Sequence, residues 1–432
     1  MGMPELVVHS PVHIGSGEKL TPYDFVFGEG KLTVVNVSSF LSESRERAED
    51  FYTHASRRGF SLKDFLTGEE VSAYRRYALR CFKEPKDVSS AIKTAHGGAY
   101  IPGSSIKGAL RTALACYFLS RGDDEVWEII KNGKDNTDIR GIRRARGRRD
   151  EKMAGEVVEK ALFRCGYKRK EGDRFTGYGD AKYDILKLIA VRDTPPMPPE
   201  DCLEVSMIKV YSINRTRVKA KGFETFVESI QPGSTFELEV LVDTKFIARA
   251  EEMESETRWI GLQEKLESLF GISGGESEQV IERKVLTVIE EACRFFADKV
   301  IERELSILPE ELYVHSTCGT VLTKDLKNRG KNYCSKCKEG NLNGSDVINL
   351  GEKVKEFYER IRGKTMLRMG FSTAWYSSTV GVMLDDELLN LLRRKFGLGK
   401  RYSSIFPKTR RFVFNGEGVY PAGWVELRGV GR

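Results

Sequence analysis

Four side chains that could bind a metal ion occur as two close pairs. His315 and Cys318 are separated by two residues, and Cys334 and Cys337 have the same spacing. Two such pairs joined by a short polar segment are typical of structural zinc sites. Four protein ligands fill a tetrahedral shell, so we predict a closed, structural zinc site inside a small zinc-ribbon-like module over residues 313–340. The alternative is three unrelated cysteines and an unrelated histidine.

Two turns rich in glycine and serine could bind an anion. The first is His13–Gly17; the second is Gly103–Gly108, which opens a helix predicted over 105–119. Backbone amides approach an anion closely at such turns, and a helix N-terminus adds unpaired donors. The residues that we expect to contact RNA here are His13, Gly15, Ser16, Gly17, Gly103, Ser104, Ser105, Lys107, Gly108 and Arg111. The alternative is a pair of tight turns without a ligand.

Nothing in the second turn indicates nucleotide hydrolysis. Lys107 precedes the last glycine, and no Ser or Thr follows it to hold Mg²⁺, as a P-loop requires. Lys107 and Arg111 are four residues apart and therefore share one helix face, an arrangement that suits an RNA phosphate.

Basic residues gather near the C-terminus. The chain has a net charge of +7, while residues 393–432 alone hold ten Lys or Arg against two Asp or Glu. Basic groups follow phosphates in single-strand recognition, so Lys408, Arg410 and Arg411 are predicted RNA contacts. Arg143 and Arg144 join them, in a basic loop at 140–149. The alternative is a solvated charged face, with the neighbouring aromatic residues in the core.

Strand and helix patterns alternate along the whole chain. Phe236, Leu238 and Val240 fall on one face of a predicted strand, and residues from about 248 to 308 look helical. Four prolines at 194–199 predict a linker or stiff turn. We therefore expect an α+β protein with an N-terminal domain at 1–194 and a C-terminal domain at 200–432, the helical stretch being an insertion in the second.

Composition sets limits on location and class. Hydrophobic residues make up 40% and charged residues 31% of the 432 positions, as in soluble globular proteins. No apolar run reaches the roughly 18 residues that span a bilayer, so we expect no membrane partner and a cytoplasmic location. The five cysteines outside the pairs are expected to be buried apolar residues.

Several motifs resemble one known family. HIGSG with Pro22–Phe25, and IPGSSIKGALRTAL over Ile101–Leu114, resemble the signature motifs of the RAMP superfamily of CRISPR proteins. The segments from Leu367 to Val380, from Phe406 to Arg411 and GWV at 423–425 resemble the fifth Csm-type subunit of type III-A interference complexes.

This resemblance implies a fold and a role. It implies two RRM-like, ferredoxin-like RAMP domains, binding to the 3′ part of a guide RNA, and help in its maturation and in complex assembly for antiviral defence. Expected partners are the guide RNA, a neighbouring RAMP backbone subunit, other Csm subunits and host nucleases. The zinc-like module is not part of the family pattern.

The resemblance also leaves an enzymatic alternative. Some RAMP proteins are metal-independent endoribonucleases with a histidine as general base, and His13 beside its glycine turn is the candidate here. No matched acid or oxyanion group is apparent beside it in the sequence. We therefore predict a non-catalytic protein, with a ribonuclease that processes guide-RNA precursor as the alternative.

Overall fold

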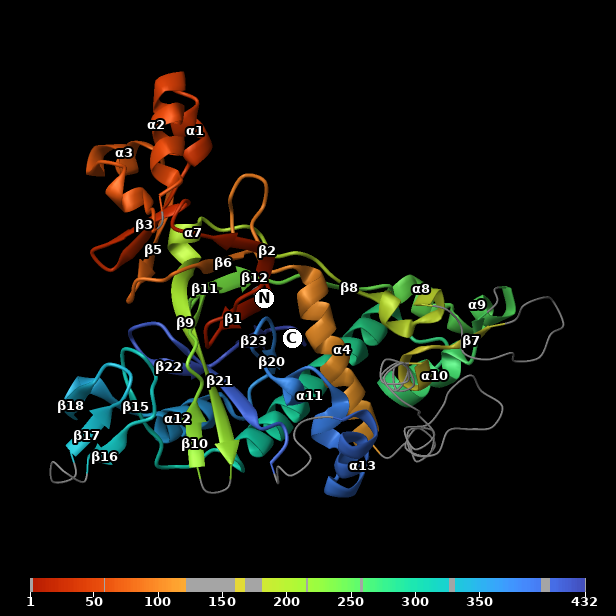
Figure 1. Cartoon of the computed structure of the whole chain (residues 1–432). Coiled ribbons are helices and arrows are strands. Elements are labelled where there is room, and N and C mark those ends of the chain that lie inside the picture. The colour runs from red at the N-terminus through yellow and green to blue at the C-terminus, as the bar shows by residue number, and fades with distance from the viewer. Residues whose placement is uncertain are drawn as a thin grey trace.

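Two large sheets organise the computed structural model (Figure 1). It describes residues 3–57, 59–121, 160–167, 181–214, 217–256, 259–325, 331–397 and 405–431. Mixed sheets and helices confirm the α+β class at this level. Arg143 and Arg144, with the predicted basic loop 140–149, lie outside the described residues.

The larger sheet has ten strands, in the order β2-β6-β11-β9-β5-β4-β3, with β10 and β21 paired to β9 and β22 paired to β21. Its long central strand β9 pairs with β11 and β5 over its first half and with β21 over its second. Its strands are β2 (Gly15–Leu20), β3 (Phe25–Gly28), β4 (Lys31–Val35), β5 (Arg75–Cys81), β6 (Val88–Ala91), β9 (Leu203–Asn214), β10 (Arg217–Ala220), β11 (Thr225–Ile230), β21 (Thr409–Phe414) and β22 (Val419–Pro421).

The smaller sheet brings the two ends of the described chain together. Its order is β12-β1-β23-β20, with Glu5 opposite both Glu237 and Arg428. The N and C marks therefore lie near each other at the centre of Figure 1. Its strands are β1 (Glu5–Val8), β12 (Thr235–Glu237), β20 (Met366–Arg368) and β23 (Trp424–Arg428).

Each sheet takes strands from both sides of the predicted boundary at 194–200. The proline-rich segment there is fixed, because Ala99 and Met197 exchange two backbone hydrogen bonds of 2.8 and 2.9 Å. The division into two RRM-like domains with an insertion stays a prediction.

Two long helices cover the centre of the molecule. Helix α4 (Gly103–Ser120) packs against α11 (Glu278–Leu305) and β20. Its stripe of Ile106, Leu110 and Ala113 is buried, as the periodicity predicts. Around them lie β7 (Gly166–Tyr167), β8 (Ile189–Val191), α7 (Pro199–Cys202), β13 (Val240–Val242), α8 (Thr244–Ala248), α9 (Ala250–Glu256), β14 (Trp259–Ile260), α10 (Leu262–Phe270), α12 (Leu350–Ile361) and α13 (Asp386–Phe396), with short 3₁₀ turns η3 (Ala181–Tyr183), η4 (Ile185–Leu188), η7 (Trp375–Ser377) and η8 (Val380–Met383).

A small helical unit between β4 and β5 projects at the top of Figure 1. It consists of α1 (Val37–Leu41), α2 (Arg45–Ala55), η1 (Leu62–Asp64) and α3 (Gly68–Ala73). Phe40, Phe51 and Leu62 form its own apolar core, separate from the main one.

The predicted metal module forms a unit of short strands at the lower left of Figure 1. These are β15 (Tyr313–His315), β16 (Thr323–Asp325), β17 (Lys331–Cys334), β18 (Glu339–Leu342) and β19 (Val347–Asn349), with η6 (Gly344–Asp346). Among the residues that the structure describes, no helix is both long and apolar enough to cross a bilayer.

Candidate functional site

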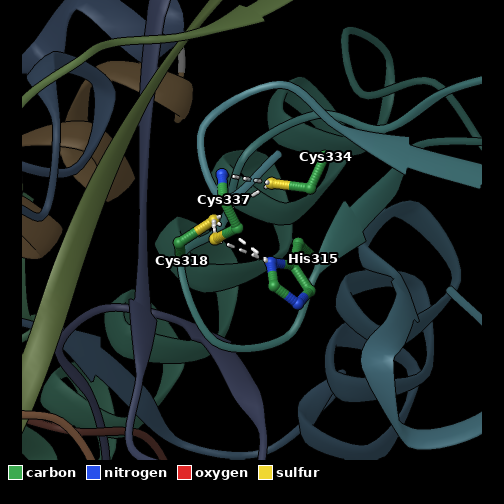
Figure 2. A group of neighbouring side chains, drawn as sticks. All are labelled: His315, Cys318, Cys334 and Cys337. Carbon is green, nitrogen blue, oxygen red and sulfur yellow. Dashed lines mark hydrogen bonds between the residues drawn. The ribbon is translucent and has the colours of Figure 1, made fainter. Parts of the chain in front are cut away.

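The four predicted metal ligands converge in one place, as Figure 2 shows. Their ligand atoms lie within 4.8 Å of one another. His315 Nδ1 is 3.3 Å from Cys318 Sγ and 3.5 Å from Cys337 Sγ; Cys318 Sγ is 3.6 Å from Cys334 Sγ. Zinc bonds of about 2.0–2.3 Å in a tetrahedron place neighbouring ligands roughly 3.5–3.8 Å apart. The group is therefore positioned to bind a metal, and sulfur atoms at these separations are not disulfide-bonded.

A carboxylate lies near the second ring nitrogen of His315. Its Nε2 lies 3.6 Å from a carboxylate oxygen of Glu339. Metal-binding histidines commonly direct the second ring nitrogen to a carboxylate, which fixes the ring for coordination. The sequence analysis did not single out Glu339.

The metal cluster packs directly on the larger sheet. Tyr211 Oη on β9 donates a 2.6 Å hydrogen bond to the carbonyl of Gly319, in the turn after Cys318. A Cβ added at Gly319 would lie 2.9 Å from Tyr211 Oη, and the φ angle of Gly319 is +62°. Only glycine fits this contact without displacement. The module is thus fixed to the sheet at this turn.

An ion-pair cluster adds a second attachment. Glu224 accepts from Lys336, which lies between the two paired cysteines, and its carboxylate is 2.9 Å from Lys83 Nζ. Burial acts to raise the pKa of Glu224, but the hydrogen bonds from both lysines hold that pKa below its ordinary value. The cluster joins the module to the loop after β5.

The first predicted anion turn is half exposed and half buried. Gly15, Ser16 and Gly17 are exposed on β2. His13 is only 6% exposed, and its Nδ1 lies 2.6 Å from the carbonyl oxygen of Glu228. Because a carbonyl only accepts, Nδ1 carries the proton and Nε2 is the unprotonated nitrogen. Burial lowers the pKa of His13.

A loop from the C-terminal half lies against this turn, and the sequence analysis did not assign it to the site. The Phe371 amide donates a 2.8 Å bond to the His13 carbonyl, and its ring meets His13 edge-on with centroids 5.9 Å apart. Phe371 is 52% exposed. Ser372 and Ala374 have φ of +74° and +72°, which is costly for non-glycine residues and clusters at functional sites. The signal available in the sequence was an aromatic residue directly after Arg368-Met369-Gly370.

The second predicted turn is built differently from the expectation. The Gly103 amide donates a 2.7 Å hydrogen bond to Asp193 Oδ1, so a carboxylate already occupies the start of α4. A Cβ on Gly103 would lie 2.1 Å from the Val191 carbonyl oxygen. Gly103 is a packing glycine, and its predicted contact with phosphate is wrong. Pro102 takes the N-cap position of α4.

The other residues of this turn differ in their access to solvent. Ser104 and Gly108 are exposed, and Ser105 and Lys107 are half-buried. Burial lowers the pKa of Lys107, while Asp184 acts to raise it. Arg111 pairs with Asp184 at 2.8 Å and lies over the ring of Phe163. Lys107 is therefore the better placed of the two cations for an outside anion.

Arg410 is a second correction. It is 2% exposed, and its Nε lies 3.2 Å from buried Glu304, which also faces Arg368 at 3.8 Å. Its Nη1 donates to the Pro407 carbonyl at 2.7 Å. On β21 alternate side chains point to opposite faces, and that of Arg410 points into the core. It does not reach an RNA phosphate, whereas Lys408 and Arg411 are half-buried.

Comparison with known proteins places this geometry in a family. The RAMP superfamily model matches residues 5–278, and the chain belongs to that superfamily. Curated relatives described as CRISPR system Cms protein Csm5 are similar in sequence. The protein of Streptococcus thermophilus is 25% identical over 261 residues, covering 55% of this chain and 63% of its own length. That of Mycobacterium tuberculosis (strain CDC 1551 / Oshkosh) is 24% identical over 269 residues, covering 55% and 65%. The match thus spans less than two thirds of these relatives.

Two solved structures share the fold. A chain of the cryo-EM structure of a Csm–crRNA–target RNA ternary complex in a type III-A CRISPR-Cas system aligns with a TM-score of 0.66 at 23% identity, over 99% of this chain and all of that one. The crystal structure of T. onnurineus Csm5 aligns with a TM-score of 0.59 at 23% identity, over 98% of this chain and all of that one. At this identity the likeness shows the fold.

Proposed function

We propose that this chain is a non-catalytic RNA-binding subunit of a type III-A CRISPR effector complex. It binds the 3′ part of the guide RNA in the cytoplasm and assists maturation and assembly in antiviral defence. Its partners are the guide RNA, a neighbouring RAMP backbone subunit, other Csm subunits and host nucleases. Membership of the RAMP superfamily and the similarity to proteins described as Csm5 support this proposal.

One structural observation carries the RNA part of the proposal. The exposed Gly15–Gly17 strand lies beside the loop 370–374, whose Phe371 ring is half exposed on the buried His13. Exposed backbone with an adjacent aromatic ring suits a single strand, because amides contact phosphates and a ring stacks on a base. Lys107, Lys408 and Arg411 supply charge. Ser104, Ser105 and Gly108 remain candidate contacts at α4, and Arg143 and Arg144 remain candidates outside the described residues.

The test is binding of a short single-stranded guide RNA by the full chain and its variants. Phe371→Ala removes one stacking ring, which should lower affinity about tenfold. Lys107→Ala should lower affinity and reduce the slope of log K against log salt by about 0.7. Lys63→Ala, an exposed lysine on the projecting helical unit, is the matched control. Equal affinity and slope in all three variants would contradict the proposed surface.

The metal cluster has a separate proposed role. Three thiols and an imidazole within one tetrahedral shell suit Zn²⁺, and four protein ligands leave no open position for catalysis. The zinc is structural and holds the module on the larger sheet. Metal analysis of purified protein should find about one zinc per chain. A chain that is folded and free of metal would contradict it.

The tautomer of His13 is compatible with the ribonuclease alternative. Its unprotonated Nε2 is the form that a general base needs. Against it, the ring is buried and the nearby Glu228 carboxylate is engaged by Tyr77, Ser90 and Lys93. Incubation with precursor RNA in EDTA decides between the two. Clean cleavage that is lost in His13→Ala would favour the enzyme.

A further inference from the structure

A pocket of about 820 Å³ is lined by residues that belong neither to the two glycine turns nor to the metal cluster. Three segments form its walls: the junction of the helical unit with β5, the turn 94–98, and the proline segment 196–199. None of these carries a predicted RNA contact. The pocket is therefore a separate feature of the fold.

The turn that forms one wall is tightly held. Thr94 and Gly98 are joined by a 2.8 Å backbone hydrogen bond, and Gly97 has a φ of +86°. A Cβ on Gly98 would lie 2.8 Å from Cβ of Pro196, so the turn and the proline segment touch. The walls are preformed rather than gathered by a ligand, and preformed sites bind with less loss of entropy.

The lining of the pocket is cationic. Arg75, Arg76 and His96 are exposed there, and none of the residues lining the pocket carries a carboxylate. Arg75 pairs with Glu200 just outside, at 2.7 Å. Arg76 makes no ion pair with any acidic side chain in the described part of the chain. An electropositive hollow with an uncompensated guanidinium favours an anion.

Aromatic and apolar surface accompanies that charge. The half-buried Tyr74 lines the same pocket as the two arginines, and Pro196 contributes an apolar wall, whereas Tyr77 is only 6% exposed and belongs to the core. Charge alone would suit any anion, whereas charge beside ring faces and apolar walls suits a base joined to a phosphate. The volume exceeds that of a single small anion and suits one or two nucleotides.

The position continues the surface proposed for RNA. Strand β6 pairs with β2, with Gly15 opposite Ala91, and the chain then enters the turn 94–98. The same chain reaches α4 only a few residues later. A strand bound along Gly15–Gly17 thus has this pocket within reach of its neighbouring nucleotides.

We propose that this pocket binds one or two nucleotides of single-stranded RNA, with Arg76 on a phosphate and the tyrosine and proline walls around a base. The inference rests on the proposed RNA-binding function and adds a second contact region to it. An acidic segment of a neighbouring protein is the competing occupant. Such a segment is negatively charged like RNA, but it carries no base that would fill the pocket.

The experiment compares RNA binding by the full chain, Arg76→Ala, Arg76→Glu and a control that exchanges two exposed arginines elsewhere, Arg45→Ala with Arg283→Ala. We expect Arg76→Ala to lower affinity about fivefold and the salt slope by about 0.7. Arg76→Glu should lower affinity further. The control should match wild type in both quantities although it removes more charge. Arg76 is exposed, so thermal unfolding of both variants should match wild type.

A second readout uses guide RNA with 4-thiouridine at successive positions, cross-linked and mapped by mass spectrometry. Adducts within 74–77 or 94–98 support the pocket. RNA binding by wild type with unchanged affinity in Arg76→Glu and no such adduct overturns the pocket and leaves the proposed function standing. Loss of binding to a neighbouring subunit, with RNA binding intact, assigns the pocket to protein. No RNA binding by the wild-type chain overturns both.

Discussion

The metal cluster and the proposed RNA-binding surface are assembled in opposite ways. The four metal ligands come from one short stretch, residues 315–337, and end up within 4.8 Å of one another. The proposed RNA-binding surface takes residues from β2, the loop 370–374 and the start of α4, which are far apart in sequence. Ligand spacing fixes a local site, whereas a surface built from distant segments depends on the strand pairing of the whole fold.

The two regions also differ in how their polar groups are satisfied. The four candidate metal ligands face one another, with their ligand atoms within 4.8 Å. At α4, by contrast, Asp193 already satisfies the Gly103 amide, and Asp184 already pairs with Arg111. A motif suited to an anion can therefore be used partly by the protein's own carboxylates.

The largest expected effect is on the metal cluster. Cys334→Ser should abolish stoichiometric zinc and lower the free energy of unfolding by about 4 kcal/mol, since metal binding contributes directly to folding. Metal analysis and urea unfolding measure both quantities. Cys293→Ala, a buried cysteine of α11 outside the cluster, should keep the metal. If Cys334→Ser contained as much zinc as wild type, the assignment of Cys334 as a zinc ligand would be wrong.

The next effect separates two glycines of one motif. Gly103→Ala should destabilise the protein by about 3 kcal/mol, because its Cβ would lie 2.1 Å from the Val191 carbonyl oxygen. A Cβ added at Gly108 would have no atom within 4 Å, so Gly108→Ala should stabilise the helix by about 0.5–1 kcal/mol. Urea denaturation of the two variants checks both signs. Similar effects at the two positions would refute the assignment of Gly103 to packing.

The smallest expected effect concerns the buried ring beneath Phe371. The pKa of His13 is lowered by burial, with the backbone bond to Glu228 opposing and Lys93 reinforcing the shift. An unfolded histidine titrates near 6.5, so acidification below that value protonates the unfolded chain first and lowers stability. The loss ends once pH falls below the folded pKa.

Thermal unfolding between pH 7.5 and 5.5 measures this loss. His13→Asn keeps a donor for the Glu228 carbonyl and should show a shallower fall than wild type. Carboxylates with lowered pKa values, such as Glu426, lose their contribution only below about 4.5 and do not enter this window. Any loss of metal at low pH is common to wild type and His13→Asn, so it cancels when their pH dependences are compared. Identical slopes would contradict the buried neutral ring.

Local patterns predicted the elements better than the surfaces. The helix over 105–119 is confirmed, because its apolar stripe repeats along one face, and the metal ligands converge as their spacing indicates. The single strand predicted from Phe236, Leu238 and Val240 divides into β12 and β13, which pair in different sheets. Alternation specifies which residues face inward but not which partner strand they meet.

The errors at Arg410 and Gly103 have one origin. Charge and residue type were visible in the sequence, but the groups opposite them were not. Glu304 lies on α11 and Asp193 follows β8, each far from its partner along the chain. Phe371 was missed for the same reason, since its contact with His13 joins opposite ends of the sequence.

The pairing of the outermost strands has a consequence for biosynthesis. Strand β1 leaves the ribosome long before one of its neighbours, β23, is synthesised, and in the finished molecule Glu5 lies opposite Arg428. At about 5–20 residues per second, β1 waits roughly 20–90 s for that partner. During this interval the edge of β1 that pairs with β23 in the finished molecule lacks that strand, and an unpaired strand edge is prone to pair with another chain. Chaperone access during synthesis should therefore influence the yield of this protein.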